Sequence, residues 1–455
     1  MSAQPSLLRQ LCQAFLSLGA LNLLGAALTF AVGILLARNL GPTGYGSYAL
    51  ALSLATLAGL GAELGLNVLT LREFAAARGT GSFAAARGLR AWSTAVILIL
   101  SALIYGLFLA LVPLLERLCS PALIETLRWG LLLIPFLGIG KVHAAALLSL
   151  GRAIAGQGPI LILRPAVFAA LLLTASLVQP QLTATQAMGL QLAATAAATL
   201  TSLGFYRSLS AVVRSEPPMF RTAAWLRACL PMALSEGLRL VQSQLGMLAV
   251  GAFSTITAAG LYRVADASAA VCLLPLSIVA LAISPAISRA HAQGDRTQLQ
   301  AVLNIVAAGQ LIVVGVAALP LLVFGEPLLA WAFGPQFGQA HRALSLLLLG
   351  AIMAALLGPA PSIGNMMGHE RAVTAGTAIA VIVQLMLSGL LVPSLGAAGA
   401  AVALGVGQCV WSGYIAIIIR LRTGLDTTIF AVRPAGLRQA VALLAAPASP
   451  RQQQA

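Results

Sequence analysis

The chain has 455 residues, of which 60% are hydrophobic and only 8% are charged. A soluble domain carries about a quarter charged residues, so this composition excludes an ordinary water-exposed globule. In lipid, every backbone polar group must be satisfied within helices or within a closed barrel. The apolar runs are continuous over about 20 residues and do not alternate with period two, which predicts an all-α polytopic membrane protein.

Twelve apolar windows of membrane-spanning length follow one another along the chain. The first six are predicted near residues 14–37, 47–69, 91–115, 129–150, 160–178 and 185–206. The second six are predicted near residues 230–252, 260–283, 302–324, 343–363, 373–392 and 397–419. An even number of spans places both termini on the same side of the membrane.

The formal net charge of +15 comes almost entirely from arginine, because Lys141 is the sole lysine. The arginines fall in short clusters between the apolar windows and form no single patch, which argues against a nucleic acid as partner. The loops on the side of the N-terminus hold most of them. The positive-inside rule therefore places both termini in the cytoplasm.

The longest polar break, Arg207 to Arg227, follows the sixth window and contains Pro217-Pro218. It predicts an N-terminal six-helix lobe (1–206), a cytoplasmic inter-lobe loop (207–227), a C-terminal six-helix lobe (228–419) and a basic cytoplasmic tail (420–455).

The two predicted lobes are weakly similar to one another. Gly46-Ser47-Tyr48 after the first window resembles Gly260-Leu261-Tyr262 after the seventh. Because six spans separate the two motifs, the lobes have the same orientation and form a parallel repeat about an axis along the membrane normal. In the tail, residues 429–446 are apolar but contain Arg433 and Arg438. Arginine at mid-helix is costly in a bilayer, so we expect an interfacial helix there rather than another span.

Ionisable residues inside a span need a partner or a function. The seventh window carries a polar stripe at helical spacing, and Glu236 and Arg239, three residues apart, can pair along it. The stripe indicates either the wall of a hydrophilic cavity or a helix–helix interface joined by hydrogen bonds. Its candidate residues are Ser235, Glu236, Arg239 and Gln242.

Lys141 lies near the middle of the fourth window, where its charge implies a carboxylate partner or an anionic substrate. His143 is two residues away and is expected to be a packed, neutral histidine. Glu63 and Asp266 are candidate coupling-ion ligands, ion-pair partners for Lys141 or Arg239, or residues at the end of a span. Two other arginines, Arg164 and Arg263, lie about one turn inside their windows and are expected to reach the interface.

Several features of soluble or ATP-driven enzymes are absent from the sequence. It has no Walker A motif and no carboxylates at metal-ligand spacing, and its five cysteines are scattered. The loops on the external side are too short for a catalytic domain. We therefore expect no cofactor, no metal and no catalytic residue, and a transporter rather than an enzyme.

One run of residues is similar to a known family. Residues 36–48 (LARNLGPTGYGSY), 63–66 (ELGL) and 72–75 (REFA) resemble the N-terminal signature of polysaccharide-biosynthesis (O-antigen-type) flippases. Residues 333–337 and 393–401 resemble later segments of that family. The resemblance implies membership of the multidrug/oligosaccharidyl-lipid/polysaccharide exporter superfamily, with two six-helix lobes facing a central cavity and alternating access in the bacterial inner membrane. Many members have fourteen spans, whereas twelve and a tail are predicted for this chain.

The substrate implied by the resemblance is a polyprenyl-diphosphate-linked oligosaccharide used in polysaccharide or O-antigen biosynthesis. Glycosyltransferases and a polymerase of the same pathway are the expected partners, besides membrane lipid. On this hypothesis Lys141 and Arg239 bind the diphosphate, and the polar residues of the seventh span accommodate the sugars. Glu63, Glu236 or Asp266 would set the equilibrium between conformations. The alternatives are an ion-coupled multidrug exporter, an integral-membrane enzyme acting on lipid-linked sugars, and a peptidoglycan-precursor flippase.

Overall fold

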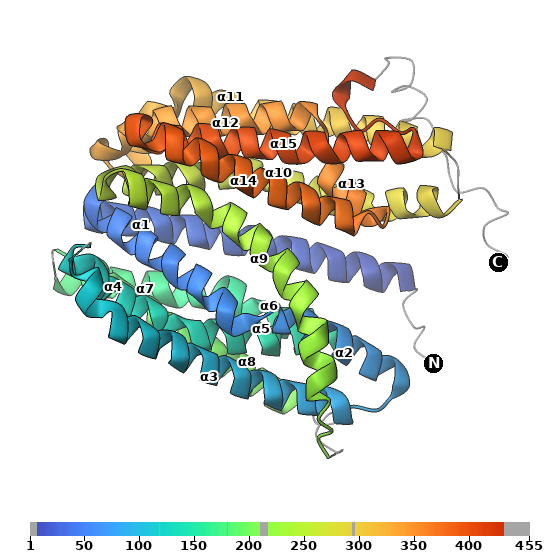
Figure 1. Cartoon of the computed structure of the whole chain (residues 1–455), viewed down its shortest axis with the longest axis horizontal. Helices are drawn as coiled ribbons and strands as arrows, with labels where there is room; N and C mark the ends of the chain where they lie inside the picture. The colour runs from blue at the N-terminus through green and yellow to red at the C-terminus, as the bar shows by residue number, and fades with distance from the viewer. Residues whose placement is uncertain (1–6, 118, 180, 210–216, 294–295, 432–455) are drawn as a thin grey trace. The chain divides into compact units, whose positions relative to one another are not determined.

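The computed structural model describes residues 7–117, 119–179, 181–209, 217–293 and 296–431, and every regular element in these ranges is helical (Figure 1). The first helices are α1 (Leu7–Glu63), α2 (Leu66–Thr80), α3 (Ala84–Leu115), α4 (Pro121–Leu131), α5 (Leu133–Ser149), α6 (Ala153–Gly158), the π-helix η1 (Pro159–Leu163), α7 (Arg164–Val178) and α8 (Ala184–Leu209). They are followed by α9 (Thr222–Phe253), α10 (Ile256–Gln293), α11 (Arg296–Phe333), the 3₁₀-helix η3 (Pro335–Ala340), α12 (His341–Leu356), α13 (Ala360–Met366), α14 (Glu370–Leu395), α15 (Ala397–Thr423) and the 3₁₀-helix η4 (Ile429–Ala431). The predicted all-α class is confirmed.

Ten helices among the described residues are long and apolar enough to cross a membrane. One of them, Gly19–Glu63, is 45 residues long and contains both the first and the second predicted window. The seventh window lies in α9, which is not one of the ten, and polar side chains interrupt its apolar sequence. The ten helices, the division of the long one and α9 together account for the twelve predicted windows.

The long helix α1 is divided at Gly41, where φ is 65° and ψ is 178°. This left-handed φ favours glycine, and the following Pro42 has no N–H to continue the helical hydrogen bonds. This pair of residues explains why one long helix contains two predicted windows, 14–37 and 47–69, with a break between them. A second break lies at Leu64 (φ 44°) and Gly65 (φ 71°), within the second predicted window, and it separates α1 from α2.

The chain forms two compact units. The first comprises Met1–Ala267 with Leu329–Phe337, and the second comprises Ser268–Leu328 with Gly338–Ala455. The predicted lobes 1–206 and 228–419 remain a prediction, as do the loop 207–227 and the tail 420–455. Residues 210–216 and 432–455 lie outside the described residues, and with them most of the predicted interfacial helix.

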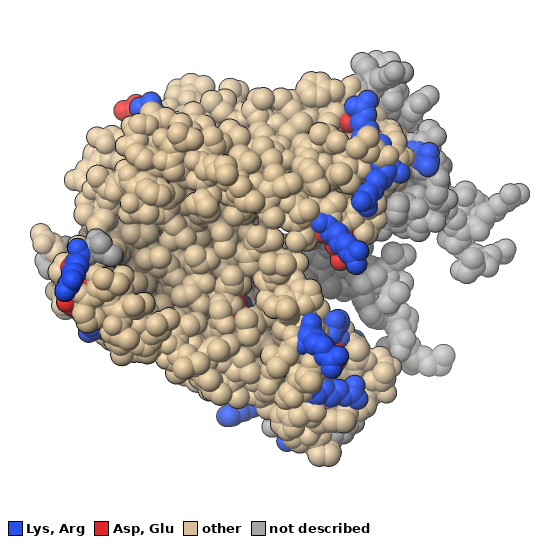
Figure 2. Space-filling model, viewed as in Figure 1, with Lys and Arg blue, Asp and Glu red and all other residues tan. Residues whose placement is uncertain are grey.

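Basic side chains gather at one end of the helices in each unit (Figure 2). In the first unit this is the end at which α2 lies, and in the second it is the end of the last turn of α15, which carries Arg420 and Arg422. The face shown has few charged side chains along the middle of the helices. A band without charge between two charged ends is what a bilayer requires of a helical bundle.

The two Gly-x-Tyr motifs of the predicted repeat contact one another within the first unit. A Cβ on Gly46 would overlap the carbonyl oxygen of Ile256, and a Cβ on Gly260 would overlap that of Pro42. The hydroxyls of Thr43 and Thr257 lie 2.9 Å apart between these contacts. Because each contact has a counterpart 214 positions along the chain, the crossing of α1 and α10 is locally two-fold symmetric, as in an isologous interface.

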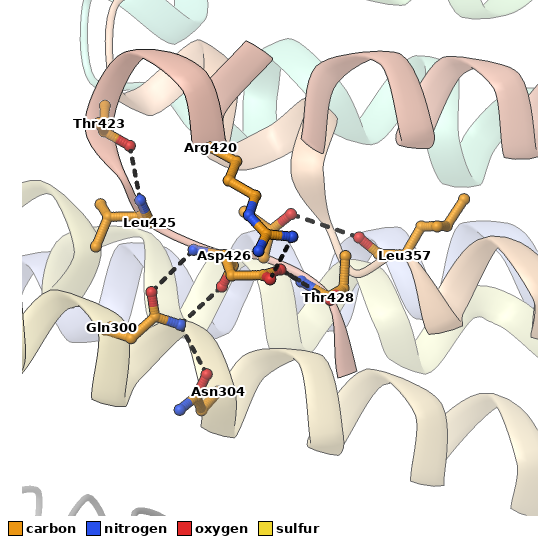
Figure 3. A network of polar contacts seen from close by, with 9 residues as sticks. Gln300, Asn304, Leu357, Arg420, Thr423, Leu425, Asp426 and Thr428 are labelled. Atoms are coloured by element: carbon orange, nitrogen blue, oxygen red, sulfur yellow. Dashed lines mark hydrogen bonds and ion pairs between the residues drawn. The ribbon is translucent and has the colours of Figure 1, made fainter. Parts of the chain in front are cut away.

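The second unit contains a polar network that attaches the segment after α15 to α11 (Figure 3). The Gln300 side chain accepts from the Asp426 N–H at 2.9 Å and donates to the Asp426 carbonyl oxygen at 2.7 Å. The Asp426 carboxylate accepts from the Thr428 N–H at 2.9 Å and lies 3.5 Å from Arg420. Beside this network, α11, α13, α14 and α15 share an apolar core that includes Leu303, Ile363 and Ile419.

Candidate functional site

The first unit contains a cavity of about 310 Å³. Its lining residues come from α1, α5, α7, α8, α9 and α10, so helices far apart in the sequence converge on it. Among the described residues, no Asp or Glu lines it. The polar and charged side chains that do so include Tyr45, Tyr48, Lys141, Arg164, Gln191, Gln244 and Arg263.

Lys141 reaches the cavity from α5 and forms an ion pair with the last residue of α1. Its Nζ donates to both carboxylate oxygens of Glu63 at 2.8 Å. The side chain of Glu63 is 18% exposed and that of Lys141 is 42% exposed, so the pair lies at the edge of the cavity with the cation on the open side. Of the partners considered for Glu63, the structure brings it to Lys141.

Arg263 lines the cavity from α10 and pairs with Asp266, three residues further along the helix. Arg263 Nη1 lies 3.3 Å from Asp266 Oδ2, which is a looser contact than that of Lys141 with Glu63. The Asp266 carboxylate therefore holds this guanidinium beside the cavity.

Arg164 is the first residue of α7 and follows directly after the π-helix η1. A π-turn inside a helix is frequently found at functional sites, because it changes the direction of the side chains that follow. In the described part of the chain no carboxylate pairs with Arg164. Arg164 therefore contributes a positive charge to the cavity wall that no carboxylate of the described residues compensates.

The local balance of charge follows from these pairs. Three basic side chains line the cavity, and two of them, Lys141 and Arg263, each have one carboxylate partner. One positive charge remains, on Arg164. An uncompensated guanidinium away from bulk water is costly, so the arrangement favours an anion in the cavity.

The predicted polar stripe of α9 lies mostly apart from this cavity. Glu236 and Arg239 pair with one another at 2.6 Å, and the Arg239 side chain is 68% exposed. Ser235 is exposed and Gln242 is buried, and the cavity lining includes neither. The roles assigned to these four residues remain predictions.

Several cavity residues were not singled out as site residues from the sequence. Gln191 and Gln244 come from helices in which nothing in the sequence distinguished them from packed amides. Tyr45 and Tyr48 belong to the N-terminal motif, so the motif did contain a signal. Their rings stack with centroids 6.4 Å apart, and Tyr48 stacks on Phe168 at the same distance, which gives the cavity one aromatic wall.

His143, two residues from Lys141, is 1% exposed and packs against the ring of Tyr206 with centroids 5.4 Å apart. It is absent from the cavity lining. Among the described residues, no cluster of three or more His, Cys, Asp or Glu side chains has a geometry that could hold a metal ion.

No protein-family model matches the chain, and no curated protein matches it. Several solved structures are similar to it. An inward-facing multidrug resistance MATE family transporter of the MOP superfamily is similar with a TM-score of 0.72 and 15% identity, covering 96% of this chain and 99% of the other. The lipid II flippase MurJ in an inward closed conformation is similar with a TM-score of 0.66 and 12% identity, covering 94% and 91%.

A third similar structure is a MOP superfamily transporter from Pyrococcus furiosus, with a TM-score of 0.60 and 17% identity, covering 90% of this chain and 95% of the other. That protein is described as having a binding pocket of reverse polarity, which suggests a different function. At these identities the likeness shows the fold alone. Over almost its whole length, the chain has the all-helical fold of the MOP superfamily transporters.

Proposed function

We propose that this protein is a transporter that flips a polyprenyl-diphosphate-linked oligosaccharide across the bacterial inner membrane. The observation that carries the proposal is the cavity of the first unit, with three basic side chains and no carboxylate in its lining. A diphosphate is a compact anion with several acceptor oxygens, and guanidinium and ammonium groups are its usual partners. The similarity of the N-terminal motif to O-antigen-type flippases supports the same substrate class.

Within this proposal Arg164 is the primary anion-binding group, because it is the basic residue of the cavity without a carboxylate partner in the described chain. Lys141 is the second, since an entering phosphate oxygen would compete with Glu63 for its ammonium group. The rings of Tyr45, Tyr48 and Phe168 stack on one another and form an aromatic wall against which the sugars would pack. The volume of about 310 Å³ suits a head group and leaves the polyprenyl chain in lipid.

An exporter of drug-like cations is the second candidate. The aromatic wall favours it, because aromatic faces attract organic cations, and the MATE transporters share the fold. The charge of the cavity argues against it, since the positive charge that remains on Arg164 repels a cation at short range.

A transport assay in vesicles that contain the purified full chain distinguishes the two candidate functions. A fluorescent polyprenyl-diphosphate oligosaccharide is placed in one leaflet, and its appearance in the other is followed by quenching. We expect flipping by the native protein, loss of most of the rate in Arg164→Gln, and partial retention in Arg164→Lys. The exposed Arg128, in the last turn of α4, is the control, and Arg128→Gln should flip at the native rate.

Ethidium movement is measured in the same vesicles. Ethidium transport without movement of the lipid-linked saccharide would overturn the flippase proposal and support the drug exporter. Native flipping rates in Arg164→Gln would show that this cavity does not bind the substrate.

A further inference from the structure

The first unit contains a second hollow, an apolar groove of about 820 Å³. One side is formed by the continuous stretch α6–η1–α7 from Gly151 to Ala166, and the other by Thr201 and Phe205 of α8. Leu21 of α1 also lines it. Apart from Arg152 and Thr201, the lining side chains are apolar or glycine, and no Asp or Glu is among them.

The groove is closed off from the cationic cavity. Leu21 lines the groove and Thr29, two helical turns further along α1, lines the cavity. Between them lies Gly25, where a Cβ would stand 2.6 Å from the carbonyl oxygen of Leu161 in η1. The backbones of α1 and η1 therefore approach closely, and this contact blocks the direct path along α1 from the groove to the cavity. A lipid that stays in the groove has its head group at the groove itself.

The mouth of the groove carries two arginines. Arg152 is a lining residue and is exposed. Arg78 lies beside it: its Nη1 donates to the Ser149 carbonyl oxygen at 3.3 Å and would be 3.1 Å from a Cβ on Gly151. Within the described chain, neither guanidinium pairs with a carboxylate. Both are therefore free to bind an anion at this end of the groove.

The length of the groove suits one leaflet. Thirteen helical steps from Ala153 to Ala166 rise roughly 20 Å, and one leaflet of a bilayer hydrocarbon core is about 15 Å thick. Two apolar lining side chains are themselves exposed, Ile154 by 63% and Phe205 by 40%. The groove therefore has the length and the apolar lining that acyl chains require, and Arg152 lies at one end of it.

We propose that this groove is a binding site for an anionic phospholipid, with its phosphate between Arg78 and Arg152 and its acyl chains along η1 and α8. Basic residues beside a membrane-facing pocket are the usual determinant of such sites. The occupant is a lipid of the surrounding bilayer and not the cargo, because the Gly25–Leu161 contact separates the groove from the cavity.

The test uses the full chain in nanodiscs of phosphatidylglycerol or of phosphatidylcholine. Hydrogen exchange is measured on peptides covering residues 151–163, which report on this site alone. Native mass spectrometry of the protein titrated with each lipid gives the affinities. We expect protection of this peptide in phosphatidylglycerol only, and a preference for phosphatidylglycerol that falls about 25-fold in Arg78→Gln/Arg152→Gln, since each arginine near a lipid surface adds about a factor of five.

A second variant fills the groove and leaves both arginines in place. Gly158 is helical, and a Cβ there would meet only the Ile154 side chain, at 4.0 Å. Gly158→Leu should therefore fold, and it should weaken the binding of both lipids while keeping their ratio. Arg128→Gln is the matched surface control and should behave as the native protein.

Equal protection of residues 151–163 in both lipids, or a native preference for phosphatidylglycerol in the double variant, would overturn the proposal. So would tighter binding of undecaprenyl phosphate than of phosphatidylglycerol through the same two arginines, because the groove would then be a substrate site. Neither readout depends on transport, so the groove and the cationic cavity are tested separately.

Discussion

Lys141 Nζ donates to both carboxylate oxygens of Glu63 at 2.8 Å, which joins the middle of α5 to the end of α1. This pair places a basic group at the cavity without adding net charge to it. It also makes Lys141 available to a competing anion, because the ammonium side chain is 42% exposed while the carboxylate is 18% exposed. The relationship leads to a first prediction about coupling between the two residues.

Lys141→Met removes the partner of a half-buried carboxylate and should destabilise the protein by about 1–3 kcal/mol. This is less than the 3–5 kcal/mol typical of a fully buried pair, because the lysine is partly exposed. Lys141→Met/Glu63→Gln should recover most of the loss, since no unpaired charge is left. Thermal unfolding of the native protein, both single variants and the double variant in detergent gives the coupling. Losses that simply add would show that the two side chains do not interact.

Gly46 and Gly260 give a prediction about the crossing of α1 and α10. A methyl group at either position would overlap a backbone carbonyl of the facing helix, which cannot move aside as a flexible side chain can. We expect Gly46→Ala and Gly260→Ala each to destabilise the protein by about 1–3 kcal/mol, and by similar amounts because the contacts are symmetric.

The matched control for these glycines is Gly106→Ala in α3, where a Cβ would meet nothing within 4 Å. That change should be neutral or slightly stabilising, because alanine is the better helix former. Apparent melting temperatures of the three variants in detergent decide the question. If Gly46→Ala were as stable as Gly106→Ala, the close crossing of the helices would be wrong.

Much of the fold was predictable because it depends on local sequence. Continuous apolar windows predict helices, and the left-handed Gly41 before Pro42 explains why the first long helix divides where the sequence indicated. Which residues line the cavity could not be predicted in the same way. Arg164 follows the π-helix η1, whose wider turn shifts the face on which later residues lie, so a regular helical period cannot assign it to a wall.

Ion pairs and hydrogen bonds between segments far apart in the chain could not be predicted from the sequence either. It placed Glu63 in the second span and Lys141 in the fourth, but the choice between Lys141 and Arg239 as partner depends on how α1, α5 and α9 pack. Arg38 is a stronger example. It belongs to the N-terminal motif, and its partners lie 293 and 294 residues away along the chain.

Arg38 yields the third prediction. Its Nη2 donates to the Trp331 carbonyl oxygen at 2.6 Å and its Nε to that of Ala332 at 2.7 Å, so it caps the last turn of α11. Arg38→Ala should cost about 1–2 kcal/mol, since both bonds are charge-assisted but exposed. Arg38→Lys should recover only part of this, because an ammonium group does not have the fork of a guanidinium.

The readout for Arg38 is hydrogen exchange of the peptide covering residues 329–337. Fraying of the last turn would expose the Gly334 N–H, which donates to Ala330, so its exchange should accelerate about tenfold in Arg38→Ala. Arg128→Ala, a change of another exposed arginine, should leave this peptide unaffected. Unchanged exchange in Arg38→Ala would contradict the capping role.

The fourth prediction concerns Gln300 and the segment after α15 (Figure 3). One side-chain amide satisfies both backbone groups of Asp426, and Gly358 (φ 76°) lets the chain pass close by, since a Cβ there would overlap the Thr427 carbonyl oxygen. Gln300→Leu leaves the Asp426 N–H without this acceptor, so its exchange should accelerate. Gln300→Glu keeps an acceptor for that N–H but loses the donor to the Asp426 carbonyl, and it should preserve more of the protection.

The Thr428 N–H is the internal reference for this experiment, because it donates to the Asp426 carboxylate and not to Gln300. Exchange at Asp426 should therefore rise more than exchange at Thr428 in Gln300→Leu. A uniform rise over the whole segment would mean that Gln300 supports α11 as a whole, and no rise at all would mean that the segment is held by Arg420 and the apolar core. The difference in exchange rate between the Asp426 N–H and the Thr428 N–H therefore isolates the contribution of the Gln300 side chain.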